Sequence, residues 1–138
     1  MLTVAISTRA LFDFSEANAV YENQGLEAYK AHQIKHESKP LAKGVCFPLV
    51  RKLLSLNSHS KEPLIDVVLC TRNSADSGLR VFNSIEHYQL PITRGIFSDG
   101  RPVHDYLKAF GVQLFLSANA EDVGHALSVG IAAATILT

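Results

Sequence analysis

The chain has 138 residues, enough for one domain with a substantial core, because a 150-residue domain buries roughly 70% of its unfolded surface. Hydrophobic residues make up 47% and charged residues 19%, which favours a packed soluble globule over a disordered chain. Thirteen basic and thirteen acidic residues cancel, and no basic stripe indicates a nucleic-acid groove. No apolar run approaches the ~20 residues of a membrane span. We therefore expect neither nucleic acid nor a membrane as partner.

The cysteines and the N-terminus indicate the compartment. Cys46 and Cys70 are the only two cysteines and lie in apolar stretches, which fits buried thiols better than a disulfide framework. The first residues, MLTVAIST, lack a charged region ahead of the apolar run and read as a strand, so no signal peptide is expected. Both features predict a cytoplasmic protein.

In the first half of the chain, an apolar run is followed by helix-favouring segments. The first helical segment is rich in Glu, Ala, Gln and Lys, with Ser15 as the expected cap, and Pro48 suits the first turn of a second helix. The expected elements are a strand at 2–7, a helix at 15–36, a break at 39–44, a helix at 47–57 and a loop at 58–63.

The second half opens with the strongest strand, LIDVVLCT, whose β-branched and almost wholly apolar residues are typical of a strand covered on both faces. Helical and strand patterns then alternate, with Gly111 and Gly130 as helix stops. The expected elements are a strand at 64–71, a helix at 75–88, a strand at 92–98, a helix at 101–110, a strand at 112–118, a helix at 120–130 and a strand at 131–137.

Strands separated by helices predict parallel pairing through right-handed crossovers. We therefore expect a single three-layer α/β/α domain over residues 1–138 with a mainly parallel five-stranded sheet. Ligands of such sheets bind beyond the carboxyl ends of the strands. The residues that follow the strands are Ser7-Thr8-Arg9, Thr71-Arg72-Asn73, Ser98-Asp99-Gly100 and Ser117-Ala118-Asn119.

Hydroxyl groups, guanidinium groups and the backbone amides at helix N-termini together suit a phosphate dianion. The alternative is that these Ser, Thr and Asn residues only cap the following helices. Lys108 would supply a counter-charge from the helix before the fourth strand, or lie on an exposed helix face. Asp122 would hold a metal ion, or stabilise the first turn of its helix.

Two histidines, His32 and His36, lie four residues apart on the first long helix, a spacing that can hold a metal. No third ligand is evident and nearby lysines disfavour a cation, so no zinc site is expected there. The remaining histidines form no visible triad with a serine. Cys70 precedes Thr71 inside an apolar strand and reads as a packed thiol rather than a nucleophile.

The chain resembles the cytosolic 5'-nucleotidase I family along nearly its whole length. The segments that carry the resemblance are AISTRALF (5–12), YENQGLEAYKAHQIKHESKP (21–40), FPLVRKLLSLN (47–57), DVVLCTRNSADSGLRVFNSIEHYQL (66–90), YLKAFGVQLFLSANAEDV (106–123) and GIAAATI (130–136). The resemblance implies a haloacid-dehalogenase-like (Rossmannoid) sheet and magnesium-dependent hydrolysis of nucleoside 5'-monophosphates, AMP prominently.

The resemblance also implies roles for individual residues. Ser7 and Arg9 stand where the superfamily has its nucleophilic and acid–base aspartates, and Thr71 matches the phosphate-binding hydroxyl of the second motif. Lys108 matches the third-motif lysine, and Asp122 falls on the later aspartate of the fourth. The expected phosphate-binding residues are Ser7, Arg9, Thr71, Asn73 and Lys108; the expected Mg²⁺ ligand is Asp122.

The departures from the family pattern leave the catalytic residues unassigned. No Asp-x-Asp pair follows the first strand, and the aspartyl-phosphate route needs a carboxylate nucleophile. We therefore expect the N-terminal part of a longer 5'-nucleotidase, with nucleoside monophosphate or phosphate as its partner. One alternative is an inactive nucleotide- or phosphate-binding fragment. The other is a structural element that pairs through an exposed sheet edge. A homo-oligomer is a possible assembly of the chain.

Overall fold

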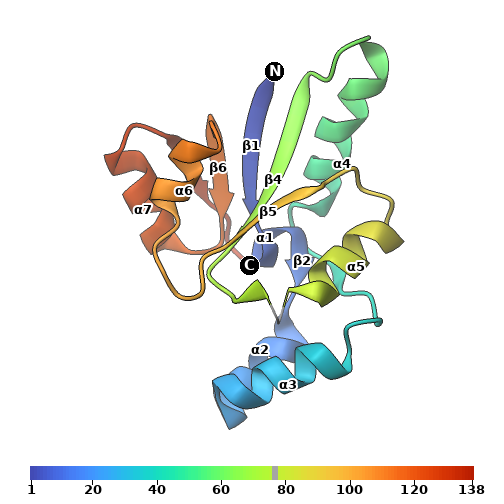
Figure 1. The fold of residues 1–138 in the computed structure, drawn as a ribbon, viewed down its shortest axis with the longest axis vertical. Helices are drawn as coiled ribbons and strands as arrows, with labels where there is room; N and C mark the ends of the chain where they lie inside the picture. The colour runs from blue at the N-terminus through green and yellow to red at the C-terminus, as the bar shows by residue number, and fades with distance from the viewer. Residues whose placement is uncertain (76–77) are drawn as a thin grey trace.

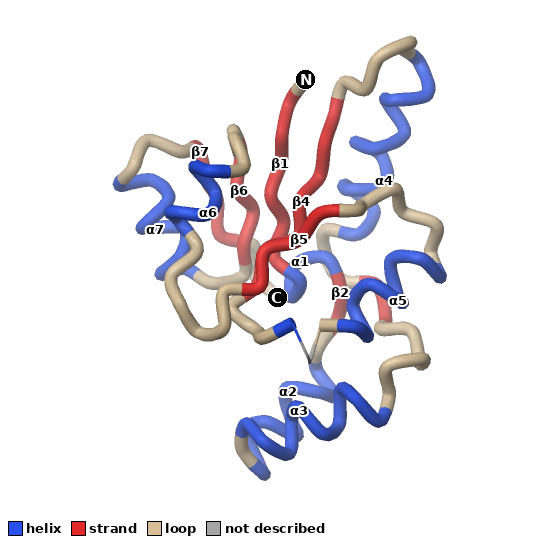
Figure 2. Tube along the Cα trace, in the orientation of Figure 1, coloured by secondary structure: helices blue, strands red, loops and turns tan. Residues whose placement is uncertain are grey.

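Five parallel strands form the centre of the protein, which is described here from a computed structural model covering residues 1–75 and 78–138. In the sheet, β1 lies between β4 and β6. The edge strands are β5 and β7, and every pairing is parallel (Figures 1 and 2). The strands are β1 (Leu2–Ser7), β4 (Ile65–Thr71), β5 (Arg94–Phe97), β6 (Leu114–Ser117) and β7 (Ala132–Thr135). All five lie within the ranges expected from the sequence.

Helices cover both faces of this sheet. One core joins one face of β1 and β4 to α1 (Thr8–Leu11), α4 (Phe47–Ser55) and α5 (Leu79–His87). The other core joins their opposite face to α6 (His104–Ala109) and α7 (Ala120–Ser128). Side chains alternate between the two faces along a strand, so Val4 and Ile6 enter the first core and Ala5 the second. The predicted three-layer α/β/α class with its five-stranded sheet is confirmed, and it is consistent with a haloacid-dehalogenase-like sheet.

A helical hairpin extends beyond the carboxyl edge of the sheet, where the sequence predicted one helix (Figure 1). It consists of α2 (Ser15–Gln24) and α3 (Leu26–Lys35), separated by Gly25. Gly25 has φ of 90°, a conformation that L side chains rarely adopt, and it lets the chain reverse. The predicted Ser15 cap is also wrong, because Ser15 is already the first helical residue and donates its backbone N–H to Asp13 Oδ1 at 2.8 Å.

Three short elements complete the described fold, and none was predicted. The two-residue strands β2 (Phe12–Asp13) and β3 (Ala42–Lys43) pair antiparallel, and the 3₁₀ turn η1 (Leu56–His59) enters the expected loop. The predicted helix at 75–88 is observed from Leu79 onward, while residues 76 and 77 lie outside the described residues. No helix within the described ranges is long and apolar enough to cross a membrane.

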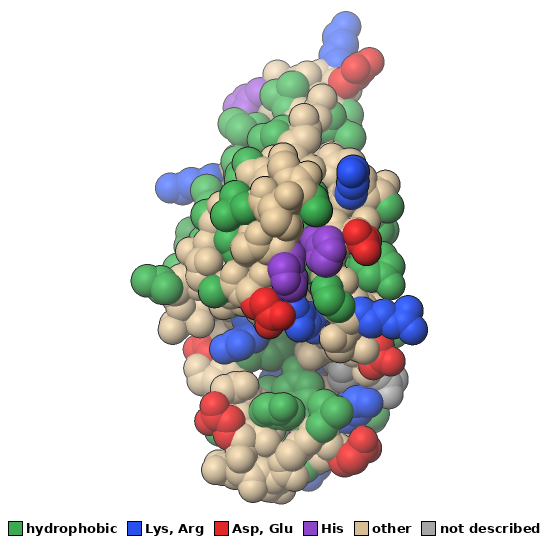
Figure 3. Space-filling model, turned by 90° about the vertical axis from the view of Figure 1, so that its left-hand side faces the viewer, with side chains coloured by type: hydrophobic (Ala, Val, Ile, Leu, Met, Phe, Trp, Pro, Cys, Tyr) green, Lys and Arg blue, Asp and Glu red, His purple; other side chains and the backbone are tan. Residues whose placement is uncertain are grey.

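The face formed by α6 and α7 carries acidic and basic side chains interspersed with hydrophobic ones, together with a pair of neighbouring histidines (Figure 3). The rings of His104 on α6 and His125 on α7 make an edge-on contact, with centroids 5.1 Å apart. Cys46 and Cys70 are both free and buried, as the sequence predicted.

Candidate functional site

The order of the strands fixes where a ligand would bind. From β1 the chain goes to β4 and β5 on one side, then crosses to β6 and β7 on the other. Open α/β sheets bind ligands at such a change of direction, outside the carboxyl ends of the strands. A cavity of about 200 Å³ lies at this place, lined by Ser7, Arg9, Cys70, Thr71, Arg72, Asn73, Val103, Phe115, Ser117, Ala118, Asn119 and Asp122.

Three hydroxyl groups line the cavity at the ends of the three central strands. Ser7 Oγ accepts hydrogen bonds from the backbone N–H groups of Ala10 (3.3 Å) and Ala118 (3.0 Å). Thr71 Oγ1 accepts from Asn73 N–H (3.1 Å), and Ser117 Oγ from Asn119 N–H (3.0 Å). The capping role considered as the alternative is therefore real for Ser7. Each oxygen only accepts in these bonds, so with respect to the described residues each hydroxyl keeps its own hydrogen for a ligand oxygen.

Arg72 and Asp122 form a close ion pair across the cavity. Arg72 Nε lies 3.0 and 3.2 Å from the two carboxylate oxygens of Asp122, and Nη2 lies 2.5 Å from Oδ1. The Asp122 side chain is 6% exposed and that of Arg72 is 27% exposed. Hydrogen bonding to Asp122 raises the pKa of Arg72, and burial followed by the Asp122 charge raises the pKa of Cys70 to about 12. Cys70 is therefore a protonated wall residue, as the sequence indicated.

Two of the three remaining predicted phosphate ligands, Asn73 and Arg9, differ in how they are held. The Asn73 side chain donates to the Tyr29 hydroxyl on α3 at 2.9 Å, which ties the strand end to the helical hairpin. Burial, the largest effect, raises the pKa of Tyr29, so its phenol stays neutral and accepts this bond. Arg9 follows β1 on α1, is exposed, and borders the cavity.

Lys108 is the one predicted phosphate ligand that the structure does not bring to the cavity. It is exposed in the last turn of α6, whose preceding residue Val103 lies at the cavity. The chain then passes Phe110, whose ring lies under Arg94 at the start of β5. Gln113 next donates its N–H to Thr3 near the amino end of β1. Lys108 thus lies toward the opposite edge of the sheet, and its predicted role has no support from the geometry.

Arg72 lines the cavity and is among the strand-end residues named from the sequence, but not among the expected phosphate ligands. The available signal was its position directly after Thr71 at the end of a buried strand. Its partner could not be found from the sequence, because Asp122 is 50 residues away. The two meet only because β4 and β6 lie on either side of β1.

The residues around the cavity do not fit a magnesium ion in this arrangement. Mg²⁺ prefers octahedral oxygen ligands, with one or two carboxylates in addition to phosphate and water. Asp122 is the only carboxylate among the lining residues, and both of its oxygens already accept hydrogen bonds from Arg72. The two arginines favour an anion instead. The expected role of Asp122 as metal ligand therefore stays a prediction, and no chemical step is derived from it.

A second cavity of about 470 Å³ shares Arg9 with the first. Its wall includes α2, where the Asn18 side-chain amide donates to Glu22 Oε1 at 3.3 Å. Phe12, Phe14 and Gly44 also line it. Arg9 therefore lines both a small cavity and a larger one, and both have mixed apolar and polar walls.

The fold and this site define a Rossmann-like α/β protein with a cavity lined by arginines and hydroxyl groups at the carboxyl edge of its sheet. The family model for 5'-nucleotidase matches residues 1–138, and the chain belongs to this family. It is 36% identical to human (Homo sapiens) cytosolic 5'-nucleotidase 1B over 141 residues. That alignment covers 98% of this chain but only 23% of the relative. No solved structure matches the chain significantly.

Proposed function

We propose that this chain binds the phosphate group of a nucleoside 5'-monophosphate as part of a 5'-nucleotidase, which releases nucleoside and phosphate. The observation that carries the proposal is the small cavity at the change of strand direction, where Arg9, Arg72 and three hydroxyl groups converge. Family membership over residues 1–138 supports the same substrate class. The activity itself is a proposal, because the chain spans about a quarter of the length of its curated relative.

The larger cavity suits the nucleoside of an AMP-like substrate. It adjoins the small cavity at Arg9, so a phosphate held there would direct its ribose and base toward α2. The Asn18 amide and the Glu22 carboxylate offer hydrogen-bonding groups at this wall, and purine bases need both donors and acceptors. We assign Asn18 to nucleoside binding and Arg9 to phosphate binding.

Binding of AMP and of inorganic phosphate to the purified chain tests these assignments, with isothermal titration calorimetry as the measurement. Arg9→Ala should weaken both ligands by about tenfold to 100-fold, because a hydrogen bond to a charged group contributes ~1.5–3 kcal/mol. Asn18→Ala should weaken AMP alone. Lys108→Ala is the matched control, since its side chain lies outside the cavity, and it should leave both affinities unchanged.

Phosphate release from AMP, measured with and without Mg²⁺, separates the enzyme from the binding module. Release that needs Mg²⁺ supports the nucleotidase, whereas tight binding without release supports the inactive phosphate-binding alternative. Failure of both ligands to bind would refute the proposal for this chain. A cytoplasmic location and a possible homo-oligomer belong to the same proposal, and the similarity to a cytosolic relative supports the location. A magnesium ion for the hydrolysis would need carboxylates other than Asp122, which is bound by Arg72.

A further inference from the structure

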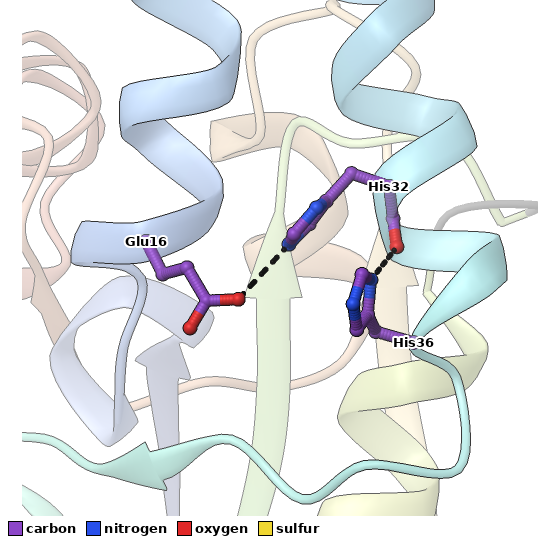
Figure 4. A group of neighbouring side chains, drawn as sticks. All are labelled: Glu16, His32 and His36. Atoms are coloured by element: carbon purple, nitrogen blue, oxygen red, sulfur yellow. Dashed lines mark hydrogen bonds and ion pairs between the residues drawn. The ribbon is translucent and has the colours of Figure 1, made fainter.

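Glu16, His32 and His36 form a cluster on the helical hairpin, away from the proposed phosphate site (Figure 4). Glu16 comes from the first turn of α2, His32 from the last turn of α3, and His36 directly follows α3. One ligand atom from each side chain lies within 4.8 Å of the other two. The sequence showed the histidine pair but no third ligand, because Glu16 is 16 residues away and reaches the pair only when the chain reverses at Gly25.

The spacing of the first two groups matches that of ligands around one small ion. His32 Nε2 lies 3.4 Å from Glu16 Oε1. In a tetrahedral site with metal–ligand bonds of 2.0–2.2 Å, neighbouring ligand atoms are about 3.4 Å apart. The ligand atom of His36 lies within 4.8 Å of the other two ligand atoms. A shift of that atom by roughly 1–2 Å or less would therefore bring it to the same spacing.

The protonation pattern leaves lone pairs on both rings. His36 Nδ1 lies 2.8 Å from the backbone oxygen of His32, which can only accept, so this nitrogen carries the hydrogen. The Nε2 atom of His36 then has the free lone pair, and a ring held through its other nitrogen is typical of metal-bound histidine. His32 Nε2 is buried and makes no hydrogen bond within the described residues, although buried polar atoms usually have a partner.

The surroundings of His32 favour its neutral form, chiefly through burial. Burial, followed by the charges of His36 and Arg80, lowers the pKa of His32, against the opposing effect of Glu16. Arg80 is itself fixed by hydrogen bonds to the Gln33 side chain and the Lys39 carbonyl. A neutral imidazole is the form that binds a metal. Arg80 and Lys35 also repel a cation, so we expect a dissociation constant of micromolar order rather than the nanomolar values of densely anionic sites.

We propose that Glu16, His32 and His36 bind one Zn²⁺ ion that links α2 to α3, with the fourth position open to water. Two imidazoles and one carboxylate suit Zn²⁺ and disfavour Mg²⁺, which prefers oxygen ligands alone. The ion would fix the hairpin that carries Asn18 at the larger cavity and Tyr29 beside Asn73. The proposal does not depend on nucleotidase activity.

Titration of the EDTA-treated chain with Co²⁺, purified without a histidine tag, tests the site through the visible absorption that low-coordinate Co²⁺ gains with nitrogen ligands. We expect one equivalent to bind and Zn²⁺ to displace it. His36→Ala should weaken binding by at least about 100-fold and Glu16→Gln by at least about tenfold. Removing a hydrogen-bond partner of a metal ligand typically weakens metal binding by roughly 10–100-fold, and removing a ligand itself should weaken it at least as much. His59→Ala is the matched control, because His59 is an exposed histidine on η1 and should leave binding unchanged.

Circular dichroism of each variant shows whether it folds. The Glu16 side chain is 61% exposed, so Glu16→Gln should fold normally and can test the site even if His36→Ala does not fold. A rise in melting temperature with Zn²⁺ that is lost in Glu16→Gln supports the site. Absence of saturable binding overturns the proposal, as does equal affinity in the wild type, His36→Ala and Glu16→Gln. Loss of binding on lowering the pH through the histidine range is expected because protons compete with the metal.

Discussion

The ion pair between Arg72 and Asp122 should be the most sensitive polar contact of the phosphate site. Three nitrogen–oxygen contacts of 2.5–3.2 Å join the two side chains, and Asp122 is only 6% exposed. Arg72→Ala would leave this carboxylate buried without its partner. Breaking a buried pair in this way typically costs ~3–5 kcal/mol, because the remaining charge has lost its water and its counter-charge. Arg72 is 27% exposed, so we expect about 3 kcal/mol, at the lower end.

Equilibrium unfolding in urea measures this loss directly, and a thermal melt should show a decrease of roughly 10 °C for a chain of this length. Asp122→Asn removes the charge but keeps an oxygen that Arg72 can reach, so its cost should be about 1 kcal/mol. Arg9→Ala is the matched control, because Arg9 is exposed and should change stability by less than about 0.5 kcal/mol. If Arg72→Ala were as stable as Arg9→Ala, water rather than the guanidinium would balance the Asp122 charge.

Two further predictions concern packing and the buried thiol. A Cβ atom at Gly44 would lie 2.8 Å from the backbone of Ala10, so Gly44→Ala should lower the free energy of unfolding, measured in urea, by ~1–3 kcal/mol. Gly124 lies in α7 with open space around a Cβ atom, so Gly124→Ala should raise the same free energy by ~0.5–1 kcal/mol. Equal effects of the two would contradict the steric argument. The unfolded Cys70 thiol ionises from its ordinary pKa of 9.0, whereas the folded one has a pKa of about 12. The unfolded state therefore binds fewer protons above pH 9, and stability falls by up to ~1.4 kcal/mol per pH unit for this group. Cys70→Ala should make the alkaline decline shallower, and an unchanged slope would show that Cys70 does not contribute.

The sheet was predictable because a buried parallel strand must be apolar on both faces, and such runs stand out between polar segments. The break at Gly25 was not, since a single glycine within a Glu- and Ala-rich segment is compatible with a continuous helix. Only its φ of 90° distinguishes the two cases. The two-residue strands β2 and β3 are too short to leave a periodic pattern, because alternation needs at least four residues to be recognised.

The site was predictable to the extent that it depends on strand ends. Ser7, Thr71 and Asn73 meet because parallel strands end at the same edge, a rule that needs no knowledge of strand order. Lys108 is not among the residues that line the cavity, because it lies in the last turn of a helix that runs back between parallel strands, and its predicted role stays a prediction. The Arg72–Asp122 pair depends on the strand order itself, which the sequence pattern left open.

The charges of the small cavity decide which ligand it can hold. Arg72 and Asp122 neutralise each other, so Arg9 supplies the uncompensated positive charge among the residues described at the cavity. A phosphate dianion therefore meets one net positive charge and the free hydroxyl hydrogens of Ser7 and Thr71, an arrangement that attracts it. A Mg²⁺ ion that entered with the phosphate would meet the same positive charge and a carboxylate already bound by Arg72. Phosphate binding by this chain should therefore persist without Mg²⁺, whereas metal-dependent hydrolysis would require carboxylates other than Asp122.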